Sequence, residues 1–445
     1  MAGSHRAQRG GGRAAAREAR REKARKRNQT IAAGVAVVVL VGGGGIAALN
    51  AFGGDGSSND AKGGKGPGDD KSSDSTVLAD DTGLLDAAAV KTLGANGTWS
   101  VGKTADAGSA EDKEFVCQAQ RFADPAGLRT WVRRFTNATT KDSAVQFVEV
   151  SNDAATAAKS YTTIINWLSQ CASEKRTRLN TSYALSGMGD KGWIAVYGQA
   201  TGPKTRYRSI SVTLAGQATL VVEHDTNGTT PPKPDAVLNA TATALQKICP
   251  QTGGCGSGTP AAKASLLPTS EPPGFMAPAE MPIIAAIDKP WVSTPGKVGN
   301  TTQCEQTDPK KAKAAKYTTQ TYLAPEFNAP TEFGLDDTVA RFASPNAAAA
   351  YLSLVRKNVD GCQKKVSTAK VSSTGTISTG GIKGEAWKAS FDTGNGKKAK
   401  YRMGIAAVDN RVVYLLFPVL PNLDITDTAF LETLTRAAER SAAYK

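Results

Sequence analysis

The sequence predicts an α+β protein in which one unit, an antiparallel sheet packed by two helices, occurs twice in tandem after a single transmembrane helix. Rare residues recur at a nearly constant separation along the chain. In both halves an amphipathic helix is followed by short strands and a closing helix, which is typical of α+β folds. A basic stretch and a long apolar stretch precede the first half.

The repeat is carried by tryptophan, cysteine and tyrosine, which are scarce elsewhere in the chain. Equivalent residues are separated by 187 to 194 positions: Trp99 and Trp291, Cys117 and Cys304, Cys171 and Cys362, Trp193 and Trp387, Tyr207 and Tyr401. Five rare residues at such similar separations are hard to obtain by chance. The sequence therefore predicts one fold, present twice.

Periodicity places the elements of each unit. A helix is expected to run into Cys171 and another into Cys362, with apolar faces formed by Ala154, Ala158, Tyr161, Ile165 and Leu168, and by Ala348, Leu352, Val355 and Val359. Three strands follow in each unit: 193–199, 207–214 and 219–224, then 387–392, 401–408 and 412–417. Each unit closes with a helix, 234–248 and 427–442.

Most of the net charge of +14 lies at the N-terminus, where residues 1–30 hold ten Lys or Arg and two Glu. The uncharged run from Ile31 to Leu49 that follows is long enough to span a bilayer. The positive-inside rule then places the N-terminus in the cytoplasm and the rest of the chain outside the plasma membrane. A cleaved signal peptide is the alternative, and it also exports the chain.

The basic tail is expected to attract anionic lipid heads. Nucleic-acid binding is not expected, because the tail lacks interleaved aromatic residues and a recognisable binding fold. A cytoplasmic adaptor role for the tail, with the exported units serving as its anchor, remains an alternative function.

All six cysteines follow the apolar run, which favours disulfides in an oxidising compartment. Six cysteines allow 15 pairings, but spacing and repetition favour Cys117 with Cys171, Cys249 with Cys255, and Cys304 with Cys362. We expect each long bridge to join an early strand to the end of the helix. With two histidines and no C-x-x-C pair, no metal site or cofactor is expected.

Composition shifts divide the chain into six parts. They are a basic tail (1–30), a transmembrane helix (31–52), a flexible linker (53–76), a first domain (77–255), a second linker (256–280) and a second domain (281–445). We expect each domain to fold without the other.

The pattern resembles the PknH-like extracellular sensor domains of actinobacterial membrane proteins. It is carried by the cysteine-bridged helix and by a turn, Gly187-Met188-Gly189-Asp190, before the strand that starts at Trp193. The resemblance implies a sensor fold with a cleft that holds a ligand. No kinase motif is present, so phosphorylation is not part of what it implies.

Two cation pairs are the candidate binding residues: Arg206 and Arg208, which flank Tyr207, and Lys400 and Arg402, which flank Tyr401. Along a strand the two cations share one face and the tyrosine takes the other. The cations either are solvated or line a groove for a small anionic ligand or an envelope component.

No enzymatic activity is expected. An envelope hydrolase that uses His224, or the S-x-x-K pair Ser367 and Lys370, is the alternative. The G-x-G-x-x-G run at 187–192 precedes a strand rather than a helix, so it predicts a turn and not a dinucleotide site.

Overall fold

The computed structural model describes residues 80–94, 96–106, 113–200, 205–297, 301–326, 329–330, 333–394 and 396–445. The expected tail, transmembrane helix and first linker lie outside these residues. Within the described ranges, no helix is both long and apolar enough to cross a membrane. The anchor at 31–52 therefore stays a prediction.

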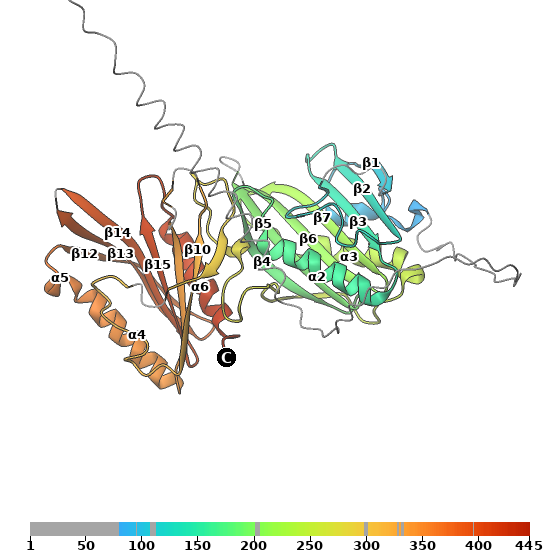
Figure 1. The fold of residues 1–445 in the computed structure, drawn as a ribbon. Coiled ribbons are helices and arrows are strands. Elements are labelled where there is room, and N and C mark those ends of the chain that lie inside the picture. The colour runs from blue at the N-terminus through green and yellow to red at the C-terminus, as the bar shows by residue number, and fades with distance from the viewer. Residues whose placement is uncertain are drawn as a thin grey trace, which may run out of the picture. The chain divides into compact units, whose positions relative to one another are not determined.

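The first repeat is built on an eight-stranded antiparallel sheet with the strand order β1-β2-β3-β7-β6-β5-β4-β8 (Figure 1). The strands are β1 Trp99–Asp106, β2 Arg129–Asn137, β3 Ser143–Val150, β4 Thr177–Ser186, β5 Lys191–Ala200, β6 Thr205–Ala215, β7 Ala218–Gly228 and β8 Ala261–Ala264.

The second repeat is built on a seven-stranded antiparallel sheet with the order β9-β10-β11-β15-β14-β13-β12. The strands are β9 Val292–Pro295, β10 Lys316–Leu323, β11 Gly334–Arg341, β12 Ala369–Thr379, β13 Ile382–Gly394, β14 Lys397–Val408 and β15 Arg411–Val419. Seven strands of the first sheet therefore match the second in order and direction, and β8 is added at one edge. The predicted α+β class with two antiparallel sheets and the predicted duplication are confirmed.

Each sheet carries one long helix on each face. The helices are α2 Ala154–Gln170 and α3 Asp235–Thr252 in the first repeat, and α4 Pro345–Asp360, the short α5 Cys362–Lys365, and α6 Asp427–Ser441 in the second. Asp153 and Ser344 cap the equivalent helices α2 and α4 by accepting hydrogen bonds from Thr156 N and Ala347 N. The helices α2 and α4 pack on one face of their sheets, and α3 and α6 pack on the other.

The sequence located the elements after the first helix of each repeat better than those before it. The strands β5 to β7 and β13 to β15 contain the predicted ranges and extend beyond each of them. The strands β4 and β12, which also follow these helices, were missed because they are rich in Ser and Thr and lack a clear apolar face. The predicted helix face at Ala154 and Ala158 is also displaced, because Ala157 and Ile164 are the fully buried positions.

All three disulfides are present, with the predicted pairing: Cys117–Cys171, Cys249–Cys255 and Cys304–Cys362. Three disulfides are typical of proteins in an oxidising, extracytoplasmic compartment. One expectation is corrected. Cys117 and Cys304 lie in turns before β2 and β10, not on strands, and Cys117 has a positive φ of 62° that no strand adopts.

Residues 256–280, expected to be a linker, contain β8 and a short 3-10 helix, η3 Pro278–Glu280. Leu267 and Ala279 pack in the core of the first repeat, whereas Phe275 and Met276 pack in the core of the second. Glu280 is 1% exposed and forms two hydrogen bonds of 2.9 Å with Arg440 of α6. This segment therefore contributes to both hydrophobic cores.

Candidate functional site

The second repeat contains a pocket of about 560 Å³ on the α4 face of its sheet, beside the turn that holds Cys304. This volume lies within the usual range for small-molecule sites. Five strands (β10, β11, β13, β14 and β15) and the segment 301–303 supply the lining: Thr301, Thr302, Gln303, Thr321, Gly334, Asp336, Phe391, Thr393, Ala399, Tyr401, Leu416 and Pro418.

The polar side of the pocket is rich in hydroxyl groups. Thr321 Oγ1 donates a hydrogen bond of 2.5 Å to Asp336 Oδ1 across the β10–β11 pair. Thr302 Oγ1 donates one of the same length to Glu305, which is 1% exposed and also accepts a hydrogen bond from Tyr414 Oη. Asp336 is the one charged residue among the described lining residues, which otherwise offer several neutral donors and acceptors.

The apolar side of the pocket is formed by two rings and two aliphatic side chains. Phe391 and Tyr401 pack edge to face, with their ring centroids 6.0 Å apart and an interplanar angle of 67°. Leu416 and Pro418 lie on the neighbouring strand β15. A ligand that suits both sides has hydroxyl groups on one side and an apolar surface on the other.

The duplication shows what the first repeat has at the same place. The hairpins β6–β7 and β14–β15 close on equivalent pairs, Ala215 with Ala218 and Val408 with Arg411. Counting outward from these turns, four pocket-lining residues of the second repeat match four charged residues of the first. Ala399, Tyr401, Leu416 and Pro418 correspond to Arg206, Arg208, Glu223 and Asp225.

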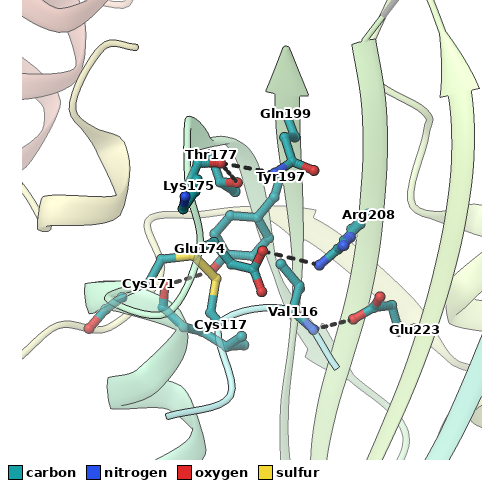
Figure 2. The surroundings of a disulfide bond; sticks show 12 residues. Val116, Cys117, Cys171, Glu174, Lys175, Thr177, Tyr197, Gln199, Arg208 and Glu223 are labelled. Carbon is teal, nitrogen blue, oxygen red and sulfur yellow. Dashed lines mark hydrogen bonds and ion pairs between the residues drawn. A yellow bond between two sulfur atoms is a disulfide. The ribbon is translucent and has the colours of Figure 1, made fainter. Parts of the chain in front are cut away.

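In the first repeat Arg206, Arg208 and Asp225 form ion pairs. Arg208 and Glu223 lie beside the Cys117–Cys171 disulfide (Figure 2). Arg206 Nε donates to both carboxylate oxygens of Asp225, at 2.8 and 2.7 Å. Arg208 lies 3.5 Å from Glu174 and 3.8 Å from Asp225. Where the second repeat has a pocket, the first repeat is therefore filled by ion pairs.

Glu223 is the most deeply buried acid of this cluster, at 6% exposed. Its Oε2 accepts a hydrogen bond of 2.6 Å from Val116 N, next to the disulfide. Burial raises the pKa of Glu223 to about 7, and the neighbouring Arg208 guanidinium opposes this shift. The carboxyl group therefore titrates near neutral pH in the folded protein.

A Glu223→Gln variant tests this titration. The raised pKa contributes stability that is fully present below the ordinary value of 4.5 and is lost as pH rises through about 7. A shift of this size corresponds to about 3 kcal/mol. We expect the unfolding free energy of the variant, from denaturant titrations at pH 5 and pH 8, to fall less with pH than that of the unmodified protein. Equal slopes would show that Glu223 ionises normally.

The predicted cation pairs are not equivalent. The turn alignment matches Arg208, and not Tyr207, with Tyr401. A shift of one residue reverses which face of the sheet a side chain occupies. Tyr207 accordingly packs in the α3-side core, whereas Tyr401 packs on the α4 side. Arg206 and Arg208 thus lie on the opposite sheet face from that of Lys400 and Arg402.

Arg402 is also held in ion pairs. Its side chain is 3% exposed and contacts Asp424 at 2.7 Å and Asp427 at 2.5 Å. Lys400, by contrast, lines a second hollow on the α6 face of the sheet. The structure therefore does not bring the four predicted binding residues together in one groove.

His224 lies within β7 and is 8% exposed. Its Nε2 is 3.8 Å from Asp142, and its ring packs against Trp99. Burial lowers its pKa, and the Asp142 carboxylate opposes this shift. Ser209 is its cross-strand neighbour but is 1% exposed, and its hydroxyl has no hydrogen-bond partner among the described residues. Ser209 is therefore not accessible to a substrate.

The other motifs occupy ordinary structural positions. Ser367 lies in the turn before β12, and Lys370 lies in β12. Gly187 and Gly189 have positive φ values of 76° and 57° in the turn between β4 and β5, as expected for that G-x-G-x-x-G run. No group of three potential metal ligands occurs in the described part of the chain.

Comparisons with known proteins assign no family. No family model and no curated protein matches the chain. Among solved structures, the acyl-CoA thioesterase II TesB2 of Mycobacterium marinum is 10% identical, covers 62% of this chain and 92% of its own, and has a TM-score of 0.12. DynU16, from the dynemicin biosynthetic locus, is 11% identical, covers 60% and 83%, and has a TM-score of 0.10. Similarities this low carry no functional argument.

Proposed function

We propose that this protein is a membrane-anchored, extracytoplasmic binding protein. In this proposal residues 31–52 cross the plasma membrane with the N-terminus in the cytoplasm, and both repeats lie outside. The basic tail and the apolar run support the anchor, and the three disulfides support the export. A sensor role, like that of the PknH-like domains, belongs to the same proposal.

The pocket of the second repeat is the proposed binding site, and its ligand is a small uncharged molecule rich in hydroxyl groups, such as a mono- or disaccharide. A sugar ring offers hydroxyl groups at its edge for Asp336, Thr321 and Gln303. Its C–H face fits against an aromatic ring such as that of Tyr401. The absence of Lys and Arg from the described lining residues argues against an anionic ligand at this place.

The observation that carries this proposal is the contrast between the repeats. At equivalent positions, paired charges fill the first repeat and uncharged side chains line a pocket in the second. If the second repeat had only lost the ion pairs, we would expect larger apolar side chains to fill their space, because protein interiors are close-packed. A maintained hollow with a carboxylate and hydroxyl groups fits a ligand better.

Substitution of pocket residues tests the proposal on the full-length protein in detergent. Calorimetric titration with a panel of neutral mono- and disaccharides is expected to identify at least one ligand. Tyr401→Ala removes the apolar contact and is expected to weaken binding by roughly tenfold, or about 1.4 kcal/mol. Asp336→Asn removes the charged acceptor and is expected to weaken it by a similar factor of about ten.

Two variants control for indirect effects. Tyr401→Phe keeps the ring and should retain most of the affinity. Asp409→Asn changes an exposed aspartate in the β14–β15 turn, where φ is 49° and asparagine is tolerated, so it should bind normally. If no neutral saccharide binds, or if Tyr401→Ala binds as tightly as the unmodified protein, the proposed ligand class is wrong.

A further inference from the structure

The second hollow of the second repeat lies on the opposite face of the same sheet, beside the start of α6. Its volume is about 410 Å³, and its lining includes Lys370, Lys388, Lys400, Ser372 and Ser390. These five residues come from the neighbouring strands β12, β13 and β14. Three lysines in one hollow repel each other unless negative charge lies among them.

Two acids lie at this hollow, Asp424 in its lining and Asp427 beside it, and both are already paired. Asp424 contacts Arg402 at 2.7 Å. Asp427 contacts Arg402 at 2.5 Å and Lys388 at 2.7 Å. The two carboxylates therefore balance Arg402 and Lys388. Lys370 and Lys400 have no carboxylate partner within the described ranges, so two positive charges remain unbalanced.

Strand pairing places these two lysines around one hydroxyl group. Lys370 pairs with Ser390, and Ser390 pairs with Lys400, so the three residues form one row across β12, β13 and β14. Neighbouring strands are about 4.8 Å apart, so the two lysine backbones are roughly 10 Å apart with the serine between them. Flexible lysine side chains can converge over Ser390 from this distance.

We propose that this hollow binds a phosphate group, held between the ammonium groups of Lys370 and Lys400 above the Ser390 hydroxyl. All three groups donate hydrogen bonds, which matches the acceptor oxygens of a phosphate. Free phosphate and a phospholipid headgroup share this chemistry. This hollow and the saccharide pocket lie on opposite faces of the sheet, and Tyr401 is in the lining of both.

The first repeat lacks this arrangement. The turn alignment matches Lys400 with Tyr207, which is 5% exposed and packed in the α3-side core. The predicted anion-binding role of Lys400 thus survives in this proposal, whereas Arg206, Arg208 and Arg402 are held by carboxylates.

Calorimetric titrations of the full-length protein in detergent at low ionic strength test the site with two probes. The probes are inorganic phosphate and a soluble short-chain phosphatidylglycerol. Lys370→Gln combined with Lys400→Gln is expected to weaken binding by more than about tenfold. The matched control is Lys383→Gln, which changes an exposed lysine of β13 that points to the other face and should leave binding unchanged.

The two probes separate the sources of the phosphate group. Lysine-dependent binding of inorganic phosphate supports a site for the free ion, and lysine-dependent binding of the short-chain lipid alone supports a headgroup site. Failure of both probes to bind, or equal binding by the double variant, would overturn the proposal. Saccharide binding by the double variant should be normal. The phosphate proposal and the saccharide proposal are therefore tested independently.

Discussion

Replacing Cys304 and Cys362 with serine is expected to lower the unfolding free energy of the protein by about 4 kcal/mol. The bridge joins residues 58 positions apart, and the stabilisation that a disulfide provides grows with the length of the loop that it closes. Saccharide binding should be lost together with stability, because Cys304 is next to the lining segment 301–303. Denaturant unfolding and calorimetric titration measure the two effects.

The Cys249–Cys255 bridge provides the matched control. It joins residues only six positions apart, so its removal is expected to cost about 2 kcal/mol. It joins Cys249 near the end of α3 in the first repeat to Cys255 just beyond that helix, and neither residue lines the pocket. Saccharide affinity should therefore be retained. If the two double-serine variants lost affinity equally, the Cys304–Cys362 bridge would have no specific role in positioning the pocket residues.

Replacing Asp337 with leucine is expected to stabilise the protein at neutral pH. Asp337 is 0% exposed, and both of its carboxylate oxygens lack a hydrogen-bond partner among the described residues. Its neighbours in the α6-side core include Tyr322, Val339 and Leu415. Replacing an unpaired buried polar group with an apolar side chain of similar shape is expected to raise the unfolding free energy by roughly 1–3 kcal/mol.

The gain should depend on pH. Burial, reinforced by the adjacent Asp336, raises the pKa of Asp337 well above its ordinary value. Stability from this group is fully present at pH values below the ordinary pKa and is lost as pH rises toward the folded-state pKa. The advantage of Asp337→Leu, measured by denaturant unfolding, should therefore be larger at pH 7.5 than at pH 4.

Asp337→Asn separates the two effects, because it removes the titration but keeps a polar group. It should flatten the pH dependence and give a smaller gain at neutral pH. Destabilisation by Asp337→Leu at every pH would contradict the assignment and would indicate that the carboxyl group has an interaction partner.

The duplication, the disulfide pairing and the order of elements could be predicted from the sequence, because they depend on rare residues and on strong periodicity. Trp99 and Trp291 are equivalent, and both indoles donate a hydrogen bond to a backbone carbonyl, of Gly94 and Pro282. The cysteine spacing indicated the correct pairing, because disulfides constrain positions that the duplication preserves. The helix–strand–helix order followed from the apolar faces.

The strand register could not be predicted from the same landmarks. Tyr207 and Tyr401 align by residue type but lie one position out of register. Tyr207 is 215 − 207 = 8 residues before the hairpin-closing residue Ala215, whereas Tyr401 is 408 − 401 = 7 residues before Val408. The error treated the two cation pairs as equivalent positions of the two repeats. A correct turn alignment, Gly216-Gln217 with Asp409-Asn410, would have matched Arg208 with Tyr401.

No sequence motif marks the pocket, because its lining differs from the first repeat by the absence of charged residues. Ala399, Leu416 and Pro418 carry no chemical signal on their own. They become informative only when they are compared with Arg206, Glu223 and Asp225 of the first repeat. The strand pairing that permits this comparison requires the structure.

Hydrogen–deuterium exchange of the full-length protein tests the central claim most directly, since it locates the ligand without a substitution. The protein is compared with and without a saccharide that binds in the titrations. We predict slower exchange at residues 301–303 and along β14 near Tyr401, and unchanged exchange along β6 and β7 in the first repeat. Protection confined to the first repeat would contradict the assignment of the site to the second-repeat pocket.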